Sequence, residues 1–148
     1  MASVGEPRPY SGKRLHHHTG GISGFACHMA RLTDESLTTI VLSNLYLFPF
    51  DRVTRGLLRV AMGLPKIVAQ GEPASPQVVG SCAGRFINQD GGVVTVGSNW
   101  RWLASDEARF CDPHDPEVEF CFSDSRDGYY HQLTYHSPLW PPARYVRG

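Results

Sequence analysis

Residues 16–25 read His-His-His-Thr-Gly-Gly-Ile-Ser-Gly-Phe, and the first half of the chain is best interpreted from this stretch. On a strand, alternate side chains point to opposite faces, so His16 and His18 share one face and His17 takes the other. Two histidines on one face can bind a metal ion, but no carboxylate or cysteine at a suitable spacing accompanies them. We therefore predict no metal site. The pair Gly20 and Gly21 permits either a turn or a close backbone approach.

The residues on either side of this stretch predict an antiparallel meander. Residues 14–18 and 24–32 have the composition of strands, and residues 33–36 that of a turn. Residues 37–44, Leu-Thr-Thr-Ile-Val-Leu-Ser-Asn, predict a strand that is largely buried.

A single amphipathic helix is expected after the meander. Pro49 and Asp51 suit its first turn, where the carboxylate faces the positive end of the helix dipole. Gly63 and Pro65 end it. Its predicted apolar stripe consists of Val53, Leu57, Leu58, Val60 and Ala61.

The second half of the chain has a different composition. Residues 66–78 combine proline, glycine and small residues, which is typical of a linker. Short strands separated by turns are then predicted at residues 84–88, 93–96, 99–103, 108–111, 118–122 and 129–134. Evenly spaced short strands favour a small antiparallel barrel or sandwich over residues 79–148.

Composition narrows the class of protein. The chain has 148 residues, 41% of them hydrophobic and 19% charged, which indicates a globular protein. Its net charge of zero gives no attraction to nucleic acid or to a membrane surface. The longest apolar run, residues 45–50, is too short to span a bilayer. The first residues lack an apolar signal segment, so we expect a cytoplasmic protein with reduced thiols; a Cys111–Cys121 bridge is the alternative if it is exported.

Residues 18–25, His-Thr-Gly-Gly-Ile-Ser-Gly-Phe, resemble the His-Thr-Gly-Gly-x-x-Gly-Phe segment of the β-lactamase-related serine hydrolases. That superfamily includes class C β-lactamases, penicillin-binding proteins, D-aminopeptidase-like peptidases and esterases. The resemblance implies an α+β fold. Residues 1–65 would be the C-terminal part of a β-lactamase-like antiparallel sheet with one packed helix. Residues 66–78 would be a linker, and residues 79–148 an appended lipocalin-like β-barrel.

The resemblance also implies roles for four residues. His18, Thr19 and Gly20 take the positions of the family's Lys/His-Thr/Ser-Gly motif, on a strand that edges the catalytic cleft. The backbone N–H of Gly21 would be one donor of the oxyanion hole. The substrate would be a small molecule or a peptide with an amide or ester bond, and no cofactor is implied.

Two further motifs of the family are missing from this sequence. Only Lys13 and Lys66 are lysines, and Tyr10 and Gly63 stand three residues before them, so Ser-x-x-Lys is absent. Tyr-x-Asn and Ser-x-Asn are absent as well. Without nucleophile and base the chain alone is predicted to be inactive. A separately encoded N-terminal half, or self-association, would cover the strands left bare.

A non-catalytic function is the alternative. The predicted barrel is rich in aromatic residues, which could line a cavity for a small ligand or form an interface. The same residues could simply fill the barrel core. They are Trp100, Trp102, Phe110, Phe120, Phe122, Tyr129, Tyr130, Tyr135 and Trp140.

Overall fold

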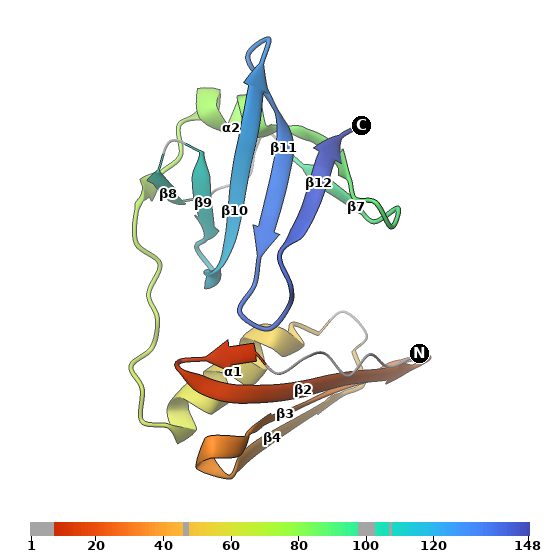
Figure 1. Cartoon of the computed structure of the whole chain (residues 1–148), viewed down its shortest axis with the longest axis vertical. Helices are drawn as coiled ribbons and strands as arrows, with labels where there is room; N and C mark the ends of the chain where they lie inside the picture. The colour runs from red at the N-terminus through yellow and green to blue at the C-terminus, as the bar shows by residue number, and fades with distance from the viewer. Residues whose placement is uncertain (1–7, 46–47, 98–102, 107) are drawn as a thin grey trace. The chain divides into compact units, whose positions relative to one another are not determined.

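The computed structural model describes residues 8–45, 48–97, 103–106 and 108–148. The chain forms two compact units, Met1–Lys66 and Ile67–Gly148, each with its own antiparallel sheet (Figure 1). This arrangement confirms the predicted α+β class, with strands predominating and a small barrel-like part. Within the described residues, no helix has the length and apolar character needed to cross a membrane.

The first unit is built on a four-stranded sheet in the order β1-β2-β3-β4, a meander in which successive strands are neighbours. Its strands are β1 (Arg8–Tyr10), β2 (Lys13–Ile22), β3 (Phe25–Leu32) and β4 (Leu37–Ser43). β2 is longer than predicted, because it continues through Gly20 and Gly21. The chain reverses at Ser23 and Gly24, where Gly24 has a φ of 82° that favours glycine.

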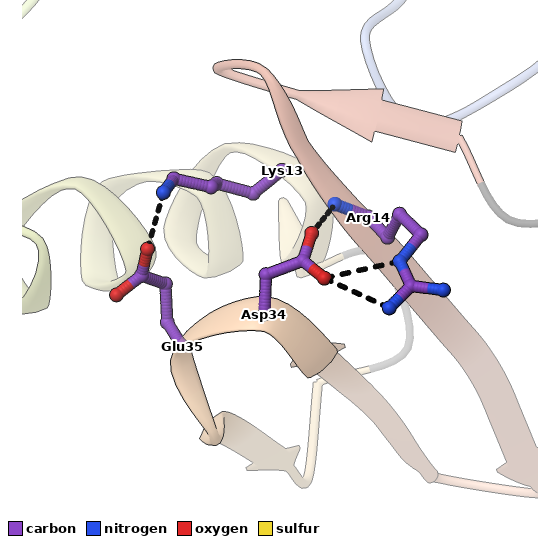
Figure 2. Close-up of polar contacts among 4 residues, drawn as sticks. All are labelled: Lys13, Arg14, Asp34 and Glu35. Carbon is purple, nitrogen blue, oxygen red and sulfur yellow. Dashed lines mark hydrogen bonds and ion pairs between the residues drawn. The ribbon is translucent and has the colours of Figure 1, made fainter.

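Two ion pairs tie the start of β2 to the 3-10 turn η1 (Thr33–Glu35), which connects β3 and β4 (Figure 2). Asp34 accepts hydrogen bonds from the backbone N–H and the Nε–H of Arg14, at 2.9 and 3.0 Å. These bonds, the backbone one above all, hold the pKa of Asp34 below its usual range. Lys13 Nζ lies 2.5 Å from Glu35 Oε1. Since solvent screens all four groups, we expect each pair to stabilise the turn only slightly.

The helix α1 (Phe50–Ala61) packs on β3 and β4 and covers one face of the sheet (Figure 1). Its buried residues are Thr54, Arg55 and Leu58, whereas Val60 is 79% exposed. The predicted apolar stripe is therefore confirmed at Leu58 and wrong at Leu57 and Val60, which are exposed. The buried side of α1 is partly polar because Thr54 meets a buried histidine, His28, at 3.1 Å.

The prediction of a largely buried strand over residues 37–44 is wrong for one of its faces. Thr39 and Val41 are buried on the side of the helix, but Ile40 and Leu42 are 64% and 77% exposed. β4 is the last strand of this sheet. Among the described elements of the first unit, α1 is the only helix, and it covers a single face.

The second unit contains an eight-stranded antiparallel sheet in the order β5-β8-β9-β10-β11-β12-β6-β7. Its strands are β5 (Glu72–Pro73), β6 (Gly84–Ile87), β7 (Val93–Val96), β8 (Leu103–Asp106), β9 (Arg109–Asp112), β10 (Asp115–Arg126), β11 (Tyr129–His136) and β12 (Ala143–Arg147). A short helix, α2 (Pro76–Cys82), begins after Ser75, whose Oγ accepts a hydrogen bond from the Val78 N–H. β5 and the start of α2 lie in the segment predicted as a linker, and most of the strand predicted over residues 99–103 lies outside the described residues.

Aromatic side chains fill the core of the second unit. Phe86, Phe110 and Phe122 are at most 5% exposed, and the Phe122 ring meets each of the other two edge to face, with centroids 5.8 Å apart. Arg147 lies over the Phe86 ring, and its guanidinium donates hydrogen bonds to the carbonyls of Tyr130, Ala83 and Ser81. This arginine joins β12 to β11 and to the end of α2.

Candidate functional site

The four residues assigned by resemblance lie consecutively on β2. His18, Thr19, Gly20 and Gly21 pair with residues of β3 in an unbroken antiparallel register, Gly20 opposite Cys27 and Gly21 opposite Ala26. Gly20 and Gly21 therefore belong to a strand. The alternative that they form a simple turn is wrong.

The side chains of these residues divide between the two faces of the sheet. The register places His18, Met29 and Ile40 in one row across β2, β3 and β4. Thr19 lies in the neighbouring row with His28, on the face that α1 covers. The strand thus brings His18 and Gly20 together on the face without a helix, and directs the Thr19 side chain to the other face.

A close contact with Cys27 limits what fits at Gly20. A Cβ placed on Gly20 would lie 2.9 Å from the Sγ of Cys27, which is closer than such atoms approach in proteins. Any larger residue at this position would displace the sulfur or the strand. The hairpin therefore packs tightly at the centre of the candidate site.

A hollow of about 470 Å³ lies beside these glycines. Residues 20–22, 25–27 and 42–44 line it, and none of them is charged. A volume of this size is within the usual range for sites that hold small ligands, about 300–1,000 Å³. The hollow is largely open to solvent.

The sheet face opposite α1 is apolar and exposed. Ile22, Phe25, Met29, Ile40 and Leu42 lie on it by register, and they are 46% to 77% exposed. Single exposed apolar residues are common, but a contiguous group of this kind marks an interaction surface. We name these five residues the bare face.

A polar cluster that the sequence did not indicate lies under α1. His28 is fully buried, and its Nε2 lies 3.3 Å from Nδ1 of His17, which is 6% exposed. On its other side, His28 Nδ1 lies 3.1 Å from Thr54 Oγ1 and 3.6 Å from Asp51 Oδ1. Asp51 and Thr54 are three residues apart on the first turns of α1, so they share a helix face. That spacing, together with a histidine in the alternating apolar pattern of β3, is the signal that could have identified the cluster.

The described residues give little support for a metal site or for a reactive thiol. Within the described part of the chain, no group of three or more histidine, cysteine or acidic side chains could hold a metal ion. The four cysteines are free thiols. Burial raises the pKa of Cys82 to about 11 and also raises the pKa of Cys111 and of Cys121, so these thiols remain protonated near neutral pH.

The described aromatic residues of the second unit pack mainly against one another. Phe120 and Tyr135 are neighbours with ring centroids 5.5 Å apart, and Phe122 contacts Tyr130 at 5.9 Å. A hollow of about 830 Å³ in this unit is lined by residues 87–90, 141–144 and 146, none of them aromatic. Trp100 and Trp102 lie outside the described residues.

Comparison with known proteins gives a weak structural likeness. No protein-family model matches the chain, and no curated protein matches it. A solved structure, the octameric penicillin-binding protein homologue from Pyrococcus abyssi, is similar over 92% of this chain, with a TM-score of 0.38 and 12% sequence identity. The chain spans 34% of the length of that protein.

Proposed function

We propose that the first unit is one wall of the active site of a β-lactamase-related serine hydrolase. In this proposal His18, Thr19 and Gly20 line the cleft, and the substrate is an amide or ester in a small molecule or peptide. A serine hydroxyl from a segment outside this sequence attacks the carbonyl carbon, the C–N or C–O bond breaks, and the amine or alcohol leaves with the proton that the serine gives up. Water then hydrolyses the acyl-serine ester, which releases the carboxylic acid and restores the serine. The observation that carries the proposal is the unbroken His-Thr-Gly-Gly strand beside an uncharged hollow.

The geometry of β2 supports Gly21 as an oxyanion donor. Ile22 and Phe25 flank a two-residue turn, and such turns commonly close with a hydrogen bond between these flanking residues. Antiparallel pairs alternate between those that exchange hydrogen bonds and those whose backbone groups point to the outer edges. Counting back from the turn places Gly21 in a pair of the second kind. Its N–H would then point away from β3, towards the side of β1, whose described residues pair only with residues 13–15, and could meet a developing negative charge.

The role proposed for His18 is to set the charge and the proton network around the catalytic base. The side chain is partly exposed on the helix-free face, in the row that contains Met29 and Ile40. A neutral or protonated imidazole there can donate a hydrogen bond to the nucleophile's base or to the substrate. The nucleophile and the base themselves would come from the segment that covers the bare face.

We infer that this covering segment is the N-terminal part of the hydrolase, which carries Ser-x-x-Lys. The bare face is apolar, β4 is an edge strand, and the seven residues of β4 include no charge that would repel a partner. Both features fit a partner that pairs with β4 and buries Ile40 and Leu42. The second unit would be an appended, non-catalytic lipocalin-like module.

The test is covalent labelling with a fluorescent penicillin and a fluorophosphonate, which report an activated serine. The chain alone is expected to remain unlabelled. The full product of the gene, with whatever coding sequence precedes the chain, is expected to form a serine adduct. Absence of labelling in a folded full product, with both probes, would contradict the proposal.

Two substitutions at one position sharpen this test. Gly21→Pro removes the proposed oxyanion N–H, and proline is tolerated on a strand where the N–H points outward. It should lower the labelling rate by about 10²–10³-fold, the usual effect of losing one such donor. Gly21→Ala keeps the N–H and is the matched control. Equal labelling of the proline variant and the alanine variant would remove Gly21 from the site.

A further inference from the structure

The buried pair His17 and His28 joins three elements of the first unit. His17 comes from β2 and His28 from β3, and the two rings meet edge to face with centroids 5.4 Å apart. Through Thr54 and Asp51, His28 also contacts α1. All of these contacts are in the layer between the sheet and the helix, where water is largely excluded.

Counting hydrogens shows how many protons this pair can hold. A neutral imidazole has one N–H donor and one acceptor nitrogen. With both rings neutral, one of the two facing nitrogens donates and the other accepts across 3.3 Å. An extra proton on His28 would still find acceptors at His17 and at the Thr54 hydroxyl, but it would place a charge on a side chain that is fully buried. A proton on each ring would set two N–H donors against each other and break the contact.

Burial of the His28 side chain, rather than the sum of the surrounding charges, opposes its protonation. Burial is the largest cause and lowers the pKa of His28 from its ordinary 6.5. Asp51 and the Phe50 carbonyl on α1 favour the charged form, while His17 and His18 on β2 oppose it. Arg55, buried on α1 one residue after Thr54, adds a permanent positive charge to the same layer. The residue paired with His28 on β4 is the uncharged Val41.

We propose that His17 and His28 form a pH-sensitive latch that holds α1 on the sheet and loosens it in mildly acidic conditions. The folded state favours a neutral His28 ring, so the latch is complete above the ordinary imidazole pKa of 6.5. Its contribution is lost as the pH falls from there towards the lowered pKa of the folded state. The latch depends only on the fold of the first unit, and so holds whether or not the chain belongs to a hydrolase.

The test is hydrogen–deuterium exchange of the full chain, read by mass spectrometry at about pH 7.5 and about pH 5.5, on either side of the imidazole range. After correction for intrinsic exchange rates, amides of α1 should lose protection at the lower pH. Because pH 5.5 is one unit below the ordinary imidazole pKa of 6.5, the lowered pKa of His28 should cost α1 up to about tenfold in protection at that pH. Strands β10 and β11 serve as the internal reference and should not change.

Two substitutions distinguish loosening that depends on His28 from a general destabilisation of the protein by acid. His28→Gln cannot titrate, and α1 of this variant should show the same protection at both pH values. His16→Gln removes an exposed histidine of the same strand pair and should leave the pH response as it is in the parent chain. A pH response that persists in His28→Gln would overturn the proposal.

A measurement on the unmodified chain covers the case in which His28→Gln fails to fold. An NMR titration of the histidine ring carbons reports each protonation step directly. The latch requires that the His28 resonance titrates below the ordinary imidazole pKa of 6.5. A His28 that titrates at this value, or above it, would refute the latch.

Discussion

Gly20 shows how one residue links packing to the candidate site. Its position opposite Cys27 leaves no room for a side chain, since a Cβ would meet the sulfur at 2.9 Å. The glycine therefore brings β2 and β3 together at the point where the hollow begins. A packing constraint coincides here with the role in the cleft that is proposed for Gly20, and measurements of stability test the packing constraint alone.

Gly20→Ala should lower the free energy of unfolding by about 1–3 kcal/mol, the usual cost of overpacking. Adding Cys27→Ala should recover most of this loss, because it removes the atom that the new methyl group meets. Urea denaturation of the parent chain, both single variants and the double variant measures the coupling. Equal losses in Gly20→Ala with and without Cys27→Ala would show that the sulfur is not the obstacle.

Gly56 is the matched glycine for this experiment. It lies on the exposed side of α1, and a Cβ there would meet nothing within 4 Å. Gly56→Ala should raise the free energy of unfolding by about 0.5–1 kcal/mol, because alanine loses less backbone entropy in a helix. Destabilisation in thermal melts would mean that this position is not in an unstrained helix.

The sequence predicted some of these residues and missed others. Alternation along a strand is enough to separate His16 and His18 from His17, and the structure agrees with that separation. The contact between His17 and His28 could not be predicted, because it depends on the register set by the turn at Ser23 and Gly24. A shift of one residue would have turned His28 to the other face.

Among the elements, β4 differs most from its prediction. Its composition suits a strand covered on both faces, yet its residues Ile40 and Leu42 are exposed. Periodicity identifies where a strand lies, but burial depends on what else packs there. The same limit explains why the apolar Val60 of α1 is exposed while Arg55 is buried. Exposed apolar residues such as Ile40 and Leu42 are typical of a surface against which another segment packs.

The edge strand β4, with its exposed apolar residues, should make the isolated chain self-associate. Ile40→Lys places a charge on the bare face at the centre of β4 and should lower the association constant by about tenfold or more, since like charges would face each other. Val60→Lys is the control, because it adds the same charge at an exposed apolar position of α1. Sedimentation velocity over a range of concentrations measures both. A parent chain that is monomeric at every concentration would contradict this view of β4.

The whole molecule consists of two units with separate cores. Leu58 is fully buried in the first unit, and Leu133 is fully buried in the core of the second. Separate cores predict that damage to one unit leaves the other folded. The boundary between the two units, after Lys66, falls at the start of the segment predicted as a linker, residues 66–78.

Leu58→Ala and Leu133→Ala should each destabilise their own unit by about 2–5 kcal/mol, the usual cost of a core cavity. Hydrogen exchange resolved by peptide should show lost protection in residues 13–61 for the first variant and in residues 84–147 for the second. Loss of protection in both units from either variant would mean that the two unfold as one cooperative body.

The family assignment for the whole protein depends on residues that this sequence does not contain. Sequencing the messenger RNA on the 5′ side of the Met1 codon would show whether they exist. We expect a continuous reading frame that encodes Ser-x-x-Lys, followed by Tyr-x-Asn or Ser-x-Asn, ahead of the His18-Thr19-Gly20-Gly21 strand. A longer reading frame without either motif would contradict the serine-hydrolase interpretation of this strand.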